Sequence, residues 1–188
     1  MKSVIRERIL EQLSAIPALV DAYHQKHSGF SDNCIDWLRR AEQALASFRL
    51  PLTSQLAGLR GAMVAATDGL SEPDSGAKRS RKLRSAQVML LLQQAEEVLR
   101  RHCDQIDQEF EEHKEKLSQL LAVASAKQPL PATDQINQAY LNRIWQQVKH
   151  TQDNSTLAHY ITARLNDTDR SYLLVDIVSN LLNSAQNQ

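Results

Sequence analysis

Residues 82–126, KLRSAQVMLLLQQAEEVLRRHCDQIDQEFEEHKEKLSQLLAVASA, decide the fold of this chain, and they contain neither glycine nor proline. Apolar residues recur there in steps of three, four and seven, with one extra residue near His102 and Cys103. These apolar positions are Leu92, Ala95, Leu99, Ile106, Phe110, Leu117, Leu120 and Ala124. This spacing is typical of a helix with one face in a core. The stretch therefore predicts one long, coiled-coil-like helix.

Shorter stretches on both sides have the same helical period. We expect helices over residues 3–15 with a continuation beyond Pro17, and over 32–48, 52–66, 134–150, 155–165 and 168–182. Pro17 should kink or split the first helix, because proline lacks the backbone N–H and crowds the preceding turn. Gly29 is the expected left-handed stop. The expected helix caps are Ser31 or Asp32, Thr133 or Asp134, and Asn154 or Ser155.

The glycine distribution favours an all-α fold. All five glycines lie at or before position 76, and no segment shows sustained strand alternation. A parallel α/β enzyme would need glycine in its phosphate-binding turns. We therefore predict a single all-α domain over residues 1–188, a bundle of about six or seven helices built around the long helix. Residues 68–81 should form a flexible basic loop and residues 127–133 a proline-rich turn.

Composition limits the classes of function and location. Twenty-two Lys and Arg residues balance 22 Asp and Glu residues, so the chain has no overall bias toward nucleic acid or anionic membranes. No uncharged apolar run approaches the ~18 residues of a membrane-spanning helix, and the charged residues near Met1 leave no apolar signal core. We expect no membrane insertion and a cytoplasmic protein, with Cys34 and Cys103 as reduced thiols in helical patterns.

A basic cluster is the first candidate binding site. Its members are Lys78, Arg79, Arg81, Lys82 and Arg84. They lie near the N-terminus of the long helix, where the helix dipole disfavours cations. This placement suggests a mobile arm that binds nucleic acid, an anionic lipid surface or an acidic protein patch. The alternative is a solvated loop, because no aromatic residue is interleaved for base stacking.

The sequence predicts no metal site and no cofactor. His24 and His27 are three residues apart, but the nearby carboxylates complete no recognised ligand pattern. The Glu-x-x-His pairs of a di-iron bundle are absent from the sequence. We interpret His102 and His113 as polar positions within a helix seam.

One motif resembles a known family. Arg143-Ile-Trp-Gln-Gln-Val-Lys-His150 resembles the Arg-x(4–6)-His signature of HEPN-domain ribonucleases. These are all-α proteins in which Arg and His meet, usually across a dimer, to cleave RNA. The resemblance implies catalytic roles for Arg143 and His150, which lie seven residues apart and hence nearly in line on a helix. Without it, both are ordinary residues near a helix boundary.

The sequence is compatible with three functions. The first is a non-enzymatic helical protein-interaction module: an adaptor, a regulator or a small subunit of a larger assembly, with a protein partner or a homo-oligomer. The second is a nucleic-acid-binding accessory protein that uses residues 78–84. The third is a HEPN-like ribonuclease that uses Arg143 and His150.

Overall fold

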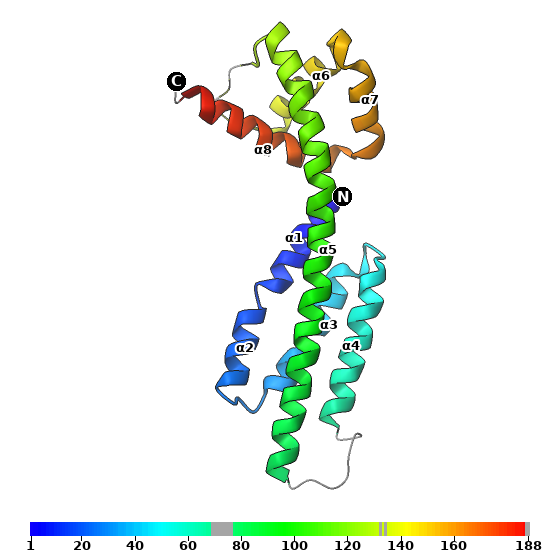
Figure 1. Cartoon of the computed structure of the whole chain (residues 1–188), viewed down its shortest axis with the longest axis vertical. Coiled ribbons are helices and arrows are strands. Elements are labelled where there is room, and N and C mark those ends of the chain that lie inside the picture. Colours follow the sequence, from blue (N-terminus) through cyan, green and yellow to red (C-terminus); the bar gives the residue numbers. More distant parts are fainter. Residues whose placement is uncertain (69–76, 132, 134, 187–188) are drawn as a thin grey trace. The chain divides into compact units, whose positions relative to one another are not determined.

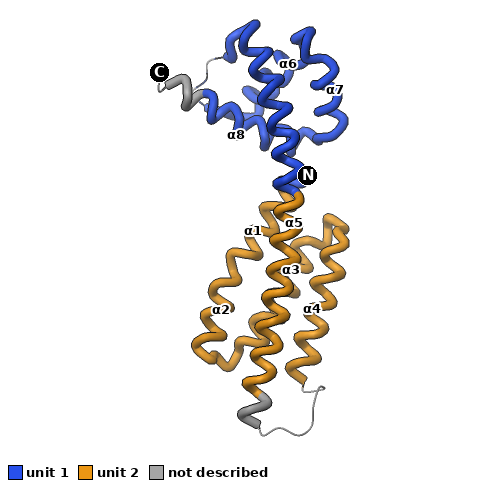
Figure 2. The backbone as a smooth tube through the Cα atoms, in the orientation of Figure 1, with its two compact units in different colours: residues 1–3, 106–188 blue, residues 4–105 orange. Residues whose placement is uncertain are grey.

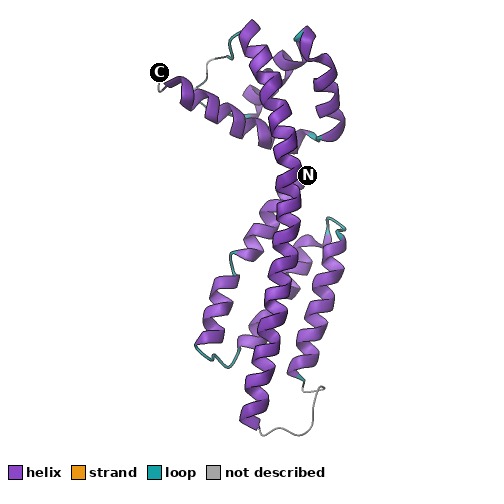
Figure 3. Ribbon diagram, viewed as in Figure 1, coloured by secondary structure: helices purple, strands orange, loops and turns teal. Residues whose placement is uncertain are grey.

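The computed structural model describes residues 1–68, 77–131, 133 and 135–186, with side chains outside 77–80 and 182–186. Helices account for nearly all of these residues, and the described part contains no strand (Figures 1 and 3). The elements are α1 (Lys2–Leu13), α2 (Ile16–His24), α3 (Phe30–Ala46), α4 (Pro51–Thr67), α5 (Ala77–Lys127), α6 (Gln138–His150), the 3-10 helix η1 (Gln152–Asn154), α7 (Ser155–Arg164) and α8 (Asp167–Gln186). The predicted all-α class and the long helix are confirmed.

The chain groups into two compact units (Figure 2). Unit 2 contains residues 4–105, and unit 1 contains residues 1–3 and 106–188. Helix α5, 51 residues long, contributes its N-terminal part to unit 2 and its C-terminal part to unit 1. Periodicity along α5 did not reveal this division. The single domain expected from the sequence stays a prediction.

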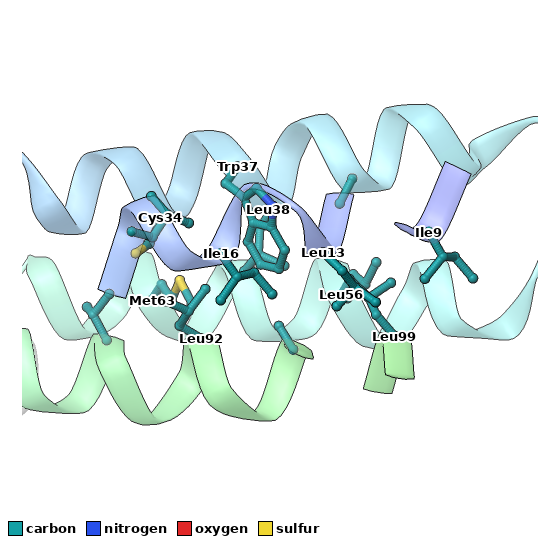
Figure 4. Packing of buried hydrophobic residues seen from close by; sticks show 14 of the residues in the cluster. Ile9, Leu13, Ile16, Cys34, Trp37, Leu38, Leu56, Met63, Leu92 and Leu99 are labelled. Atoms are coloured by element: carbon teal, nitrogen blue, oxygen red, sulfur yellow. The ribbon is translucent and has the colours of Figure 1, made fainter. Parts of the chain in front are cut away.

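Unit 2 is held together by an apolar core that draws on all five of its helices. Labelled core members in Figure 4 are Ile9, Leu13, Ile16, Cys34, Trp37, Leu38, Leu56, Met63, Leu92 and Leu99. The Trp37 indole is 1% exposed, and its Nε1 donates to the Gln12 carbonyl oxygen at 3.0 Å. Helices α3 and α4 pack against each other, as expected from their short connection. Pro51 begins α4, where its missing N–H costs nothing.

Unit 1 combines the C-terminal part of α5 with α6, α7 and α8. Its core includes Leu117, Leu120, Leu121, Ile144, Val148, Ile161, Leu174 and Val178. Buried Asn154 links this core through its amide, which donates to the Leu120 carbonyl oxygen at 3.0 Å and to the Val148 carbonyl oxygen at 3.3 Å. A buried amide with two acceptors fixes the turn between α6 and α7.

Buried Asp169 of α8 binds the first turn of α1 within unit 1. Its Oδ1 accepts hydrogen bonds from the Ser3 amide at 2.9 Å and the Ser3 hydroxyl at 2.7 Å. Its Oδ2 accepts from the Met1 nitrogen at 2.7 Å, the Lys2 amide at 2.9 Å and Asn166 Nδ2 at 2.7 Å. The carboxylate thus satisfies helix N-terminal donors that have no partner within α1.

Two predicted boundaries near α3 were wrong. Lys26 has the positive φ, 55°, and is the left-handed residue after α2, whereas Gly29 has φ −90°. Helix α3 begins at Phe30, so Ser31 and Asp32 lie inside its first turn and do not cap it. Burial of the Phe30 side chain, 2% exposed, accompanies this earlier start.

The boundaries of α5 and α6 also differ from the prediction. Helix α5 begins at Ala77, so residues 77–81 are helical. Of the rest of the predicted loop, Asp68 forms a turn after α4, and residues 69–76 lie outside the described residues. Helix α6 begins at Gln138, because Asn137 accepts a hydrogen bond from the Tyr140 amide at 2.9 Å and caps it. Thr133 accepts from the Gln135 amide in a local turn, and Asp134 is outside the described residues. Of the predicted proline-rich turn, residues 128–131 and 133 lie in the non-helical connection, whereas Lys127 ends α5 and residue 132 is outside the described residues.

Candidate functional sites

The predicted basic cluster lies in the first turns of α5. The side chains of Lys78 and Arg79 are outside the described residues, whereas Arg81, Lys82 and Arg84 are exposed. Arg84 has a structural role, because its Nη1 donates to the carbonyl oxygen of Thr67, the last residue of α4, at 3.4 Å. A cation is favourable at a helix C-terminus. Arg84 therefore supports the fold at the end of α4.

Two exposed leucines lie beside this cluster, and we did not single them out from the sequence. Leu83 is 51% exposed and Leu90 is 59% exposed. Seven residues apart, they lie two turns apart along one line of α5, on the side opposite buried Leu92 and Leu99. The run from Met89 to Leu92 could have indicated an exposed apolar residue, because four consecutive residues of a helix cannot all face one core.

The same side of α5 continues into a shallow depression with polar walls. It is lined by Gln93, Glu96, Glu97, Arg100, Arg101 and Asp104. Two ion pairs at four-residue spacing form there: Arg100 to Glu96 at 2.7 Å and Arg101 to Glu97 at 2.6 Å. The charges of these two pairs are therefore balanced within α5. We define the outer face of α5 as Leu83, Leu90 and the residues that line the depression. Its N-terminal part, with the two leucines, is apolar, and the residues that line its C-terminal part are polar or charged.

Arg143 and His150 are both exposed on α6. His150 Nδ1 lies 2.7 Å from the Gln146 carbonyl oxygen, four residues earlier in the same helix. Seven residues of helix separate the two side chains by about 10 Å along the axis. The only described contact of His150 is this one within α6. Pairing of Arg143 with His150 would therefore need a second chain, as in the dimers that the family resemblance implies.

His113 of α5 is a buried titratable residue of unit 1. It is 9% exposed, and its buried Nδ1 has no hydrogen-bond partner. Its ring packs edge-on against Tyr160 of α7, with 6.2 Å between ring centroids. Burial lowers the pKa of His113, and nearby Lys116, Lys2 and Arg164 lower it further, while Glu112 opposes them. Burial also lowers the pKa of His102 in unit 2.

The cysteines and the other ligand types form no catalytic or metal-binding arrangement that the structure describes. Cys34 is 0% exposed and Cys103 is 5% exposed, as expected for core positions. Burial raises the pKa of Cys34 to about 12, which leaves it a poor nucleophile. Among the described residues, no three His, Cys, Asp or Glu side chains are placed to hold a metal ion.

The fold and these surfaces define a class of all-α helical bundle protein. No family model, curated protein or solved structure matches the chain. Among the described residues, no helix combines the length and the apolar character needed to cross a membrane.

Proposed function

We propose that this protein is a non-enzymatic helical interaction module that binds a partner through the outer face of α5. The observation that carries the proposal is the exposure of Leu83 and Leu90 two turns apart on one line of a helix. Exposed leucines at this spacing are typical anchors for a partner helix. The two buried thiols support a cytoplasmic location, where cysteines stay reduced.

Charge decides what kind of partner fits this face. Arg81 and Lys82 are exposed beside Leu83. A second copy of the chain aligned in parallel would place these cations against their own counterparts. An antiparallel copy that pairs Leu83 with Leu90 would place them at the level of Leu92 and Leu91, and Leu92 is buried on the other side of the helix. Neither arrangement supplies a carboxylate, so the partner is a different protein with apolar anchors flanked by acidic residues.

The test places a photo-crosslinking amino acid at position 90 and, as a control, at exposed Gln55 of α4. We expect a cross-link to one protein from position 90 and none from position 55. That protein, once purified, should bind the wild type in a salt-dependent manner. Binding should weaken at least ~10-fold in Leu83→Ser/Leu90→Ser, while the salt dependence should fall in Arg81→Ser/Lys82→Ser. Self-association through position 90, or binding unaffected by these variants, would reject the proposal.

The exposure of Arg81 and Lys82 also favours a second candidate function, nucleic-acid binding. A labelled 20-nucleotide single-stranded RNA and a duplex DNA of equal length are suitable probes. Replacement of all five basic residues of the cluster by serine should abolish binding and its dependence on salt, because each phosphate contact releases counterions. Unchanged binding in this variant would remove the second candidate.

The ribonuclease resemblance stays a prediction. It requires Arg143 and His150 from two chains to meet at an interface formed by α6. Degradation of RNA that disappears in His150→Ala, with α6 intact by circular dichroism, would support it. Absence of degradation by the wild type would end it.

A further inference from the structure

Three histidines of unit 1 lie on described helices, and one of them differs from the others. His150 and His159 are exposed, and the Nδ1 atom of each lies 2.7 Å from the carbonyl oxygen four residues earlier, in Gln146 and Ser155 respectively. His113 has no such contact, although it also lies within a helix. The imidazole of His113 is instead turned into the packing between α5 and α7, against the ring of Tyr160.

The protonation state of His113 follows from this packing. In the neutral ring, a proton on Nε2 leaves only the lone pair of Nδ1 buried, which costs less than a buried N–H group without an acceptor. A second proton would place an N–H on Nδ1, where no acceptor lies within reach. The folded structure therefore accommodates the neutral ring and resists the imidazolium.

The charged groups around His113 act in the same direction. Lys2 of α1, Lys116 of α5 and Arg164 of α7 all face it and repel a positive ring. Lys116 and Arg164 also lie over the Tyr160 ring, at 4.9 Å and 5.8 Å from its centroid.

Two carboxylates oppose these cations, but both are paired with them. Glu112 binds Lys116 at 2.5 Å and accepts a longer hydrogen bond, 3.4 Å, from the Tyr160 hydroxyl. Glu109 is paired with Lys2. The surroundings as a whole thus carry no uncommitted negative charge, among the described contacts, that could stabilise a protonated His113.

We propose that His113 is a pH-sensitive contact between α5 and α7, and that its protonation below neutral pH releases α7 from unit 1. An unfolded or opened chain takes up the proton more readily than the packed one, because the opened ring is hydrated. Opening is therefore favoured as the pH falls through the ordinary range of histidine, and the closed form is fully stable above about pH 6.5. Tyr160 loses its ring contact when His113 leaves.

The wild-type protein provides the first test. Nuclear magnetic resonance spectra of the imidazole groups between pH 8 and pH 5 should show that His113 titrates below the ordinary range of histidine. Hydrogen exchange of the α7 amides, corrected for the intrinsic effect of pH, should show a loss of protection between pH 7.5 and pH 5.5. A titration midpoint of His113 within or above the ordinary range of histidine would overturn the proposal without any variant.

Two matched variants complete the test. His113→Phe keeps a ring against Tyr160 but cannot be protonated, so the protection of α7 should become independent of pH. His159→Gln, at an exposed position of α7, should keep the pH dependence of the wild type. Persistence of that dependence in a folded His113→Phe protein would overturn the proposal. If His113→Phe fails to fold, the wild-type titration still decides.

Discussion

Asp169→Asn tests whether the carboxylate of α8 is the main attachment of the first turn of α1. The substitution keeps the size and shape of the side chain but replaces one acceptor oxygen with an NH2 group. Oδ1 accepts two hydrogen bonds, and Oδ2 accepts three. Whichever way the amide turns, its NH2 group faces at least one N–H donor that cannot reverse, so at least one hydrogen bond is lost and a donor is left buried.

The structure sets the magnitude of this effect. The Asp169 side chain is 3% exposed, so water cannot replace the lost partners. A hydrogen bond to a charged group contributes about 1.5–3 kcal/mol, and the neutral amide also weakens the hydrogen bonds that remain, because they are no longer made to a charged acceptor. We therefore expect Asp169→Asn to lower the free energy of unfolding by about 3–5 kcal/mol, a large part of the ~5–15 kcal/mol typical of a folded protein.

Urea unfolding at pH 7, followed by circular dichroism, measures this loss. The matched control is Asp176→Asn, because Asp176 lies on the same helix but is 51% exposed and paired with Lys114; it should cost less than about 1 kcal/mol. Ser3→Ala should cost about 1–2 kcal/mol in the wild type and much less in Asp169→Asn, since both changes remove the same contact. Equal stability of Asp169→Asn and Asp176→Asn, or additive effects of Asp169→Asn and Ser3→Ala, would refute this reasoning.

Three further predictions follow from the same structure. Acid should destabilise the wild type more than Asp169→Asn. Burial alone would raise the pKa of Asp169, but its hydrogen-bond donors lower that pKa overall. The carboxylate's contribution to the free energy of unfolding is therefore complete above about pH 4 and is lost as the pH falls through the lowered folded pKa, which urea unfolding at pH 2–5 can measure. Leu99→Ala removes a side chain with 0% exposure and should cost about 2–5 kcal/mol, whereas Leu90→Ala on the same helix should cost less than about 0.5 kcal/mol in the same urea assay. Asn154→Leu leaves the Leu120 and Val148 carbonyl oxygens without their amide donor and should cost about 1–3 kcal/mol, while Asn142→Leu, at an exposed position of α6, should be nearly neutral.

The helices and the buried face of α5 could be predicted because both depend on short-range spacing. Leu92, Leu99 and Ile106 are buried as their positions in the pattern required. Helix α5 extends a few residues beyond the predicted range at its N-terminal end, where residues 77–81 have no apolar period to reveal a helix.

Contacts between distant residues could not be predicted in this way. Ser3 and Asp169 are 166 positions apart, and nothing in the sequence near either residue marks it as a partner of the other. The bond from Arg84 to the Thr67 carbonyl oxygen depends on how α4 and α5 lie together, which periodicity leaves open. Asn154, one of the two predicted residues, is the N-cap of α7. The caps of α3 and α6 were missed for another reason: several Ser, Thr, Asn and Asp residues lie near the start of each helix, and only the folded backbone selects among them.

The positions of the two cysteines make them natural probes of how often unit 2 opens. Both cysteines of the chain belong to unit 2, one on α3 and one on α5, and both are buried. A thiol reagent attacks the thiolate, and burial keeps Cys34 protonated at neutral pH. The rate of alkylation at each cysteine therefore reports how often its helix exposes that side chain, while the resonances of His113, His150 and His159 report on unit 1. The unmodified sequence thus allows the opening of each half of the chain to be timed separately, without an added label.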